Sequence, residues 1–318
     1  MRLVAAMAAA WAVCGGAQAA SVGFATLSVP VAGDRPLTLG VWYPTDAPET
    51  VQPLLLSRQS VAAGAPVRGE GLPLVVMSHG TGGSFADHYD TAHALAEAGF
   101  VVAAPSHTGD TYDDHSRALR IGERAPAIVR VIDYMTAEWP DHARIDAGRI
   151  GMFGFSSGGF TALVAIGGRP DLGLIGPHCA EHPTYFDCQL KGGEPSTAMS
   201  AGGYDPRIRA AVIAAPALGF TFAPHGLDEV KVPVQLWRAG ADRILPHPLY
   251  AEAVRGLLPT PPDYRVVEGA DHFDFLPPCS PALAQAAPQI CGDGIFDRAG
   301  FHARFNAEVV AFLQRTLR

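Results

Sequence analysis

GFSSGG, residues 154–159, joins two segments of different character. The apolar run RIGMFGF (149–155) is typical of a buried strand, and the small-residue segment SGGFTALVAIGG (157–168) predicts a helix. A strand, a G-x-S-x-G turn and a helix in this order form a nucleophile elbow, a sharp turn that presents a serine hydroxyl. The stretch therefore predicts a reactive serine at the end of a strand.

Glycine spacing distinguishes the two adjacent serines. Ser156 has Gly154 two residues before it and Gly158 two residues after it, whereas Ser157 would need a glycine at Phe155. Glycines at these positions allow the strand and the helix to approach closely. We therefore predict that Ser156 is the nucleophile and that the backbone N–H of Ser157 faces the developing oxyanion.

Strands and helices alternate on both sides of this turn. The pair ATLSVPV and LTLGVWYP predicts two early strands joined by AGDRP, and continuous apolar runs are typical of parallel strands covered on both faces. Those runs are LPLVVMS (72–78), VVAAP (101–105), IRAAVIAAPAL (208–218), VPVQLWRAG (232–240) and YRVVEG (264–269). Helices are predicted in 87–100, 122–138, 247–258 and 301–317. The alternation predicts an α/β fold with a mostly parallel central sheet flanked by helices.

Two segments lack a clear period. Residues 53–71 are predicted to be a loop, because no sustained alternation is visible there. Residues 168–205 are rich in glycine and contain two cysteines, and long irregular inserts in compact domains are often functional lids. We therefore expect 168–205 to be a lid-like insert in one domain spanning 20–318.

A serine hydroxyl needs a base, and the base needs a carboxylate that orients it. His272, in VEGADHFDF, follows the last predicted strand, and Asp242, in RAGADRILP, follows the strand before it. The order serine, acid, histidine is the order expected after an elbow. We predict a Ser156–Asp242–His272 triad, with Asp228 and Asp271 as the competing carboxylates.

The second oxyanion donor is expected in the loop after an early strand. VVMSHGTGGS (75–84) supplies such a loop. His79 and Gly80 would turn the chain, and the Thr81 N–H is the predicted donor.

The N-terminus and the charge limit the partners. Arg2, the apolar run Leu3–Val13 and Ala17-Gln18-Ala19 are typical of a signal peptide over 1–19, which predicts a periplasmic or secreted protein without a stable membrane anchor. The formal net charge is −8 without a basic block, so a nucleic-acid partner is not expected.

Four cysteines remain after residue 19, and an even number in an exported chain predicts two disulfides. Three connectivities are open, and we favour Cys179–Cys188 and Cys279–Cys291 because each pair brackets one loop. A metal site that includes His178, Cys179 and His182 is the competing interpretation, although its spacing matches no zinc pattern well.

Three further features are candidates for contact with a ligand or the substrate. Asp110, Asp113, Asp114 and His115 could bind a cation, but they more simply predict a solvated acidic loop. His107 follows a strand and is a candidate for substrate contact. Phe155, beside the nucleophile, is a candidate for the substrate pocket or for the core.

With SHGTGG, GFSSGG, GADRILP and GADHFDF in this order, the chain resembles the α/β-hydrolase fold over nearly all of residues 20–318. SHG, PSHTGDT (105–111), the GFSxGG elbow and DHFDF are similar to the bacterial dienelactone-hydrolase-like proteins related to platelet-activating factor acetylhydrolases. That subgroup often has His-Pro-Gly-Asn-Thr where this chain has residues 107–111. In the acetylhydrolases the acid tends to follow the strand after the elbow. Here Ala217-Leu218-Gly219 stand there, which favours Asp242, as in dienelactone hydrolases.

The resemblance implies hydrolysis of small carboxylic esters with short or truncated acyl chains, without a cofactor. The same triad can cleave amides, so a peptidase or amidase is one alternative. A cutinase-like polyester hydrolase is a second alternative, and an inactive binding module is an alternative of a different class.

Overall fold

A ten-stranded sheet forms the centre of the computed structural model, which describes residues 21–292 and 294–318. The strand order is β10-β9-β8-β7-β5-β6-β2-β1-β4-β3. The six strands from β10 to β6 in this order are parallel to their neighbours, and β1 is also parallel to β4. The pairs β6–β2, β2–β1 and β4–β3 are antiparallel. The mostly parallel sheet that the sequence predicts is confirmed.

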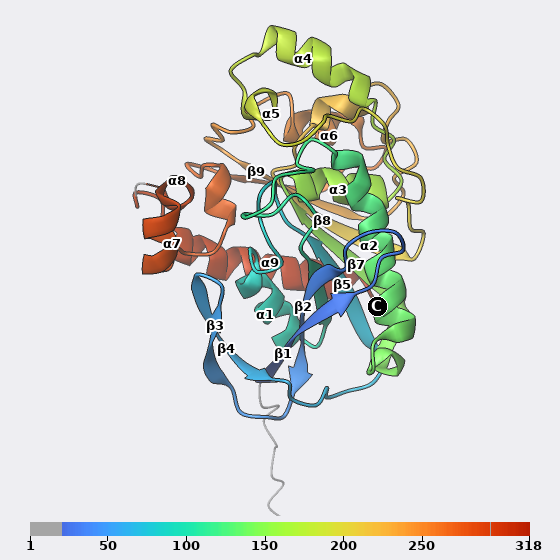
Figure 1. The fold of residues 1–318 in the computed structure, drawn as a ribbon, viewed down its shortest axis with the longest axis vertical. Helices are drawn as coiled ribbons and strands as arrows, with labels where there is room; N and C mark the ends of the chain where they lie inside the picture. Colours follow the sequence, from blue (N-terminus) through green and yellow to red (C-terminus); the bar gives the residue numbers. More distant parts are fainter. Residues whose placement is uncertain (1–20, 293) are drawn as a thin grey trace, which may run out of the picture.

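The elements follow one another in the predicted alternation (Figure 1). The strands are β1 (Ser21–Val29), β2 (Leu37–Thr45), β3 (Thr50–Leu54), β4 (Ser57–Ala63), β5 (Leu72–Ser78), β6 (Val101–Pro105), β7 (Ile145–Phe155), β8 (Ile208–Ala214), β9 (Val234–Ala239) and β10 (Asp263–Val267). The α-helices are α1 (Tyr89–Glu97), α2 (Arg124–Asp133), α3 (Ser157–Ala165), α4 (Ile175–Glu181), α5 (Phe186–Gln189), α6 (Ala251–Leu257), α7 (Pro281–Ala286), α8 (Pro288–Cys291) and α9 (Arg298–Thr316). Short 3-10 or π turns are η1 (Ile121–Glu123), η2 (Tyr134–Glu138), η3 (His142–Arg144), η4 (Leu172–Leu174), η5 (Gly219–Phe222) and η6 (His272–Phe275).

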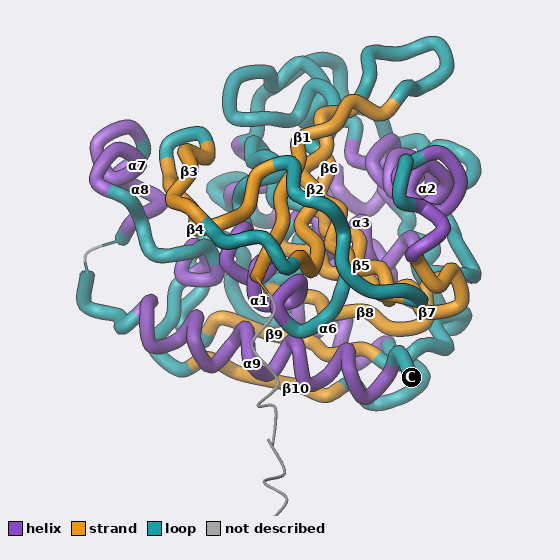
Figure 2. The backbone as a smooth tube through the Cα atoms, turned by 90° about the horizontal axis from the view of Figure 1, so that it is seen from below, coloured by secondary structure: helices purple, strands orange, loops and turns teal. Residues whose placement is uncertain are grey.

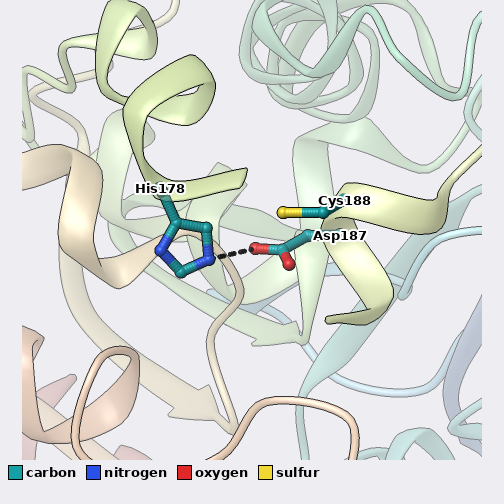
Figure 3. A group of neighbouring side chains, drawn as sticks. All are labelled: His178, Asp187 and Cys188. Atoms are coloured by element: carbon teal, nitrogen blue, oxygen red, sulfur yellow. Dashed lines mark ion pairs between the residues drawn. The ribbon is translucent and has the colours of Figure 1, made fainter. Parts of the chain in front are cut away.

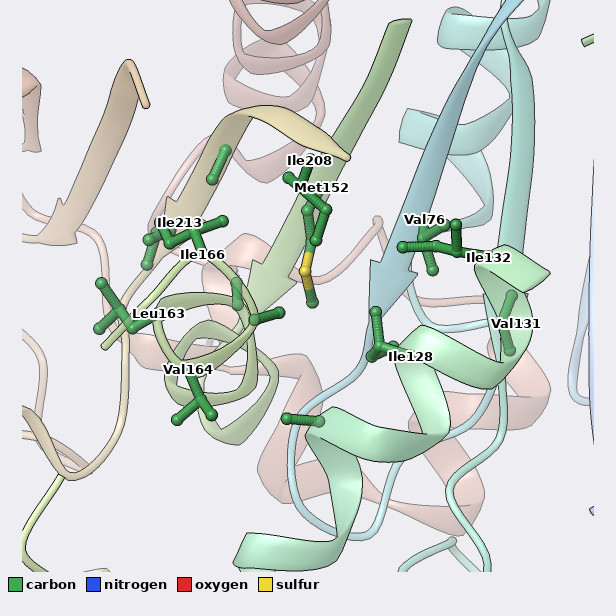
Figure 4. Close-up of a cluster of buried hydrophobic side chains, with 14 of the residues drawn as sticks. Val76, Ile128, Val131, Ile132, Met152, Leu163, Val164, Ile166, Ile208 and Ile213 are labelled. Atoms are coloured by element: carbon green, nitrogen blue, oxygen red, sulfur yellow. The ribbon is translucent and has the colours of Figure 1, made fainter. Parts of the chain in front are cut away.

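Helices cover both faces of the sheet. Along β5, Leu74 and Val76 belong to one hydrophobic cluster, and Val75 and Met77 belong to the other. The first cluster includes side chains of α2 and α3 (Figure 4), and the second includes side chains of α1 and α9. Figure 2 shows α9 along one side of the strands and α2 on the other side. Burial on both faces explains why the central strands are continuously apolar in the sequence.

The carboxyl ends of the central strands bring the predicted site residues together. Ser78, the last residue of β5, is the register partner of Gly154 in β7, and Phe155 is the partner of Ala214 in β8. Parallel strands end at the same edge, so the loops after β5, β7, β9 and β10 emerge side by side. These are the loops that carry the four predicted parts of the site.

The prediction of a loop over 53–71 is wrong for its first half. β3 and β4 form a hairpin, and β4 pairs with β1 through Gly23 and Ala62. Leu55 and Leu56 make the two-residue turn, with Leu55 at φ 49°. Such turns usually contain glycine, asparagine or aspartate, so the sequence lacks the usual hairpin signal.

The insert 168–205 is folded onto the rest of the chain. Its backbone donates hydrogen bonds at Arg169 to Gly226, at Ser196 to Leu119, and at Asp205 to Ala165. The Cys179–Cys188 disulfide links its two short helices, α4 and α5, which lie beyond α6 at the top of Figure 1. A lid function for the insert stays a prediction.

The second disulfide, Cys279–Cys291, brackets α7. Both bridges have the favoured connectivity. Disulfides are typical of exported proteins. The predicted signal peptide, 1–19, lies outside the described residues. Within the described ranges, none of the helices combines the length and apolarity needed to cross a bilayer.

Replacement of Phe305 in α9 tests the core on this face of the sheet. Phe305 is fully buried among Trp237, Phe275 and Phe301, so Phe305→Ala should lower the free energy of unfolding by about 3–5 kcal/mol. Urea denaturation followed by circular dichroism measures this change. Glu308→Ala, on the solvent side of the same helix, should change it by about 0.5 kcal/mol or less, and equal losses in both variants would contradict this packing.

Candidate active site

Ser156 lies in a strained turn between β7 and α3. Its backbone has φ 55° and ψ −119°, a conformation that non-glycine residues rarely adopt. A Cβ atom at Gly158 would overlap the carbonyl oxygen of Ser78, and one at Gly154 would overlap the carbonyl oxygen of Gly158. The two glycines are therefore needed because strand and helix pass in backbone contact.

His272 lies between Ser156 and Asp242. Its Nε2 is 3.0 Å from Ser156 Oγ, and its Nδ1 is 2.9 Å from Asp242 Oδ2. The other carboxylate oxygen of Asp242 accepts hydrogen bonds from the backbone N–H groups of Ile244 and Leu245, at 3.0 and 2.7 Å. The carboxylate is thus fixed at both oxygens. In this geometry His272 can accept the serine proton while Asp242 holds the ring and its tautomer.

The competing carboxylates are occupied elsewhere. Asp228 pairs with His225 on the surface, and the two side chains are more than half exposed. Asp271 accepts a hydrogen bond from the backbone N–H of His272 and pairs with Arg243. Asp242 is the only one of the three predicted carboxylates that contacts the imidazole.

Thr81 and Ser157 lie together beside Ser156. Their hydroxyl oxygens are 2.6 Å apart, and Ser157 is the first residue of α3. Gly80 lies against the serine, since a Cβ atom there would be 3.4 Å from Ser156 Cβ. The positive end of the α3 dipole favours negative charge at this point. The arrangement can stabilise an anion that forms beside Ser156 Oγ.

The structure separates the two candidate pocket residues. Phe155 is 2% exposed, and its ring centre is 4.8 Å from that of His272, so it is a core residue beneath His272. His107 is equally buried, with its Nε2 2.8 Å from Ser78 Oγ. It lies in the wall of a cavity of about 410 Å³ that is also lined by Asp110 and Arg124.

The prediction of a solvated acidic loop is wrong for Asp110. Its side chain is 4% exposed and forms an ion pair with Arg124, which is equally buried. Asp114, in contrast, pairs with Arg35 at the surface. Sequence reasoning did not identify Arg124, because an arginine at the start of an amphipathic helix is normally exposed.

The metal site considered from the sequence included His178, Cys179 and His182. In the structure, the side chains that lie close together at this point are those of His178, Asp187 and Cys188 (Figure 3). The sulfur of Cys188 is bonded to Cys179, so it is not available as a thiolate ligand. His178 Nε2 lies 3.5 Å from Asp187 Oδ2, and the Tyr250 hydroxyl donates to the same oxygen. Burial lowers the pKa of His178. Through Tyr250, these contacts join the insert 168–205 to the segment between Asp242 and α6.

Comparison with known proteins bears on the fold. No protein-family model matches the chain, and no curated protein matches it. The chain is similar to a solved ferulic acid esterase from Streptomyces cinnamoneus, with a TM-score of 0.64 and 24% sequence identity over 96% of this chain and 93% of that chain. With the sheet order and the flanking helices, this likeness confirms the α/β-hydrolase fold class.

Replacement of Asp242 tests the hydrogen-bonded chain of three side chains. Asp242→Asn should slow the reaction of Ser156 with a fluorophosphonate by about 10⁴-fold, the size of effect seen when a triad loses its carboxylate. The rate can be followed by intact-mass spectrometry. Asp228→Asn is the matched control and should react like the wild type, and an Asp242→Asn variant that also does so would exclude Asp242 from the site.

Proposed function

We propose that this chain is a serine-dependent carboxylic ester hydrolase that cleaves small esters with short or truncated acyl chains. The observation that carries the proposal is the position of His272, within hydrogen-bond distance of both Ser156 Oγ and Asp242 Oδ2. The sequence motifs similar to dienelactone-hydrolase-like and acetylhydrolase-like proteins support the same activity.

In the proposed mechanism, Ser156 Oγ attacks the ester carbonyl while His272 Nε2 accepts the hydroxyl proton. Asp242 stabilises the imidazolium through Nδ1–H. The backbone N–H groups of Thr81 and Ser157 donate to the oxyanion of the tetrahedral intermediate, and such donors contribute about 3–4 kcal/mol each. His272 then protonates the leaving alcohol. A water molecule deprotonated by His272 attacks the acyl-enzyme and releases the acid.

The burial of the site favours small substrates. Ser156 is 7% exposed and His272 is 2% exposed. A folded polypeptide or a polyester chain requires an open cleft around the nucleophile, whereas a small ester does not. This burial supports an esterase over a peptidase or a cutinase-like enzyme.

A panel of substrates tests the proposal. It contains p-nitrophenyl esters from acetate to palmitate, methyl ferulate and aminoacyl anilides. The acetate or butyrate ester should have the highest kcat/KM among the p-nitrophenyl esters, and the esters should exceed the anilides. Faster turnover of the anilides would contradict the proposal in favour of an amidase. No turnover and no labelling by a fluorophosphonate would favour a binding module.

The adjacent serines provide a matched pair of variants. Ser156→Ala should reduce kcat by about 10⁶-fold, because the nucleophile is lost. Ser157→Ala keeps its backbone N–H and loses only the hydroxyl contact with Thr81, so kcat should fall by about tenfold or less. Initial rates on p-nitrophenyl butyrate measure both effects. Activity retained in Ser156→Ala would exclude the mechanism.

A further inference from the structure

A buried arginine contacts the loop that carries the proposed oxyanion donor. We call residues 79–82 the oxyanion loop. Arg124, at the start of α2, donates from its guanidinium to the carbonyl oxygens of His79, at 2.6 Å, and Gly80, at 3.2 Å. Burial of a charged side chain has a high free-energy cost unless the charge is paired and hydrogen-bonded. The position of Arg124 therefore calls for a specific reason.

Asp110 completes the contacts with the same loop. One carboxylate oxygen accepts from the Arg124 guanidinium, and the other accepts from the backbone N–H of Gly82 at 2.8 Å. Thus one ion pair binds backbone groups on both sides of Thr81. These contacts fix the peptide planes next to the proposed Thr81 donor without a contact to Ser156.

His79 adds a second set of contacts. Its Nδ1 is 2.6 Å from the Gly80 carbonyl oxygen, and its Nε2 accepts from the backbone N–H of His107 at 3.0 Å. Burial and the neighbouring charge of Arg124 lower the pKa of His79 to about 3. The ring is therefore neutral at ordinary pH, with its proton on Nδ1.

A cavity lies beside the ion pair. About 410 Å³ of space is lined by His107, Asp110, Arg117 and Arg124, among others. None of the four residues of the oxyanion loop is among the residues that line this space, and Asp110 and Arg124 contact the loop from its wall. Within the loop, Gly80 lies against Phe155 and Ser156.

We infer that Asp110 and Arg124 are positioning residues that hold the oxyanion loop so that the Thr81 N–H is directed at the reacting oxygen. This inference rests on the proposed function, since it concerns the proposed oxyanion donor. A purely structural ion pair would stabilise the fold without a selective effect on the transition state. A conservative substitution at a positioning residue should lower the reaction rate of the folded enzyme, whereas the same substitution at a purely structural ion pair should lower only the stability.

The experiment compares Arg124→Lys and Asp110→Asn with the wild type. Lysine keeps the positive charge but lacks the fork that reaches both carbonyl oxygens and the carboxylate. Asparagine can still accept from Gly82 but no longer neutralises Arg124. A misplacement of about 1 Å can lower a rate by about 10²-fold, so kcat of Arg124→Lys on p-nitrophenyl butyrate should fall by about 10- to 100-fold with little change in KM. Titration with a fluorophosphonate gives the concentration of folded, reactive enzyme.

A trifluoromethyl ketone provides the selective readout, because its adduct with Ser156 carries an oxyanion. Its inhibition constant should rise in the two variants by about the same factor as kcat/KM falls. Arg207→Lys is the matched control, since Arg207 also pairs with a buried aspartate, Asp205. Both residues come just before β8, at the amino end of that strand, whereas the site lies at the carboxyl ends of the strands. This control should lower the melting temperature without a change in kcat or in the inhibition constant. Wild-type kcat and inhibition constant in folded Arg124→Lys and Asp110→Asn would overturn the inference and leave the proposed function intact.

Hydrogen exchange separates this inference from the proposed function. Peptides that cover residues 79–84 should exchange faster in Arg124→Lys than in the wild type or in Arg207→Lys. If the wild-type protein neither hydrolyses an ester nor reacts with the fluorophosphonate, the proposed function is wrong, and exchange alone then decides whether Arg124 holds this loop. Unchanged exchange in folded Arg124→Lys would overturn the inference.

Discussion

The close approach of α3 to the ends of β5 and β7 is the constraint on which the site depends. Gly154 and Gly158 allow backbone contact where any side chain would overlap a carbonyl oxygen. This contact fixes the strained conformation of Ser156 and brings Ser157, the first residue of α3, next to Thr81 of the oxyanion loop. The loops after β9 and β10 then need only cross the same sheet edge to bring Asp242 and His272 to the serine.

Much of this arrangement is predictable from the sequence because it depends on local patterns. Apolar runs identify the central strands, glycine spacing distinguishes Ser156 from Ser157, and chain order favours Asp242 and His272. The strand and glycine signals lie within a few residues of the feature they predict, and the prediction of Asp242 and His272 adds only the order of the loops along the chain. The disulfide connectivity also follows from proximity along the chain, since each bridge brackets one short loop.

The features that the sequence does not reveal depend on contacts between distant segments. The hairpin of β3 and β4 has a Leu-Leu turn, and its polar Gln59 is buried because its side chain accepts from the indole N–H of Trp42. Asp110 belongs to a group of acidic residues that the sequence predicts to be exposed to solvent. In the structure it is buried against Arg124. Composition describes one segment at a time. The residues of one segment therefore do not predict which residue of a distant segment will contact them.

The distance along the chain between contacting residues also has a temporal consequence. Ser156 and His272 are separated by 116 positions, and Asp90 of α1 finds its partner His302 in α9 only 212 positions later. A growing chain therefore completes the turn at Ser156 long before it contains His272. The sheet face that α1 shares with α9 is fully covered only when α9 is available. Any prefix that ends before His272 contains Ser156 without the imidazole beside it, so the proposed reactivity of the serine requires a chain that extends past His272.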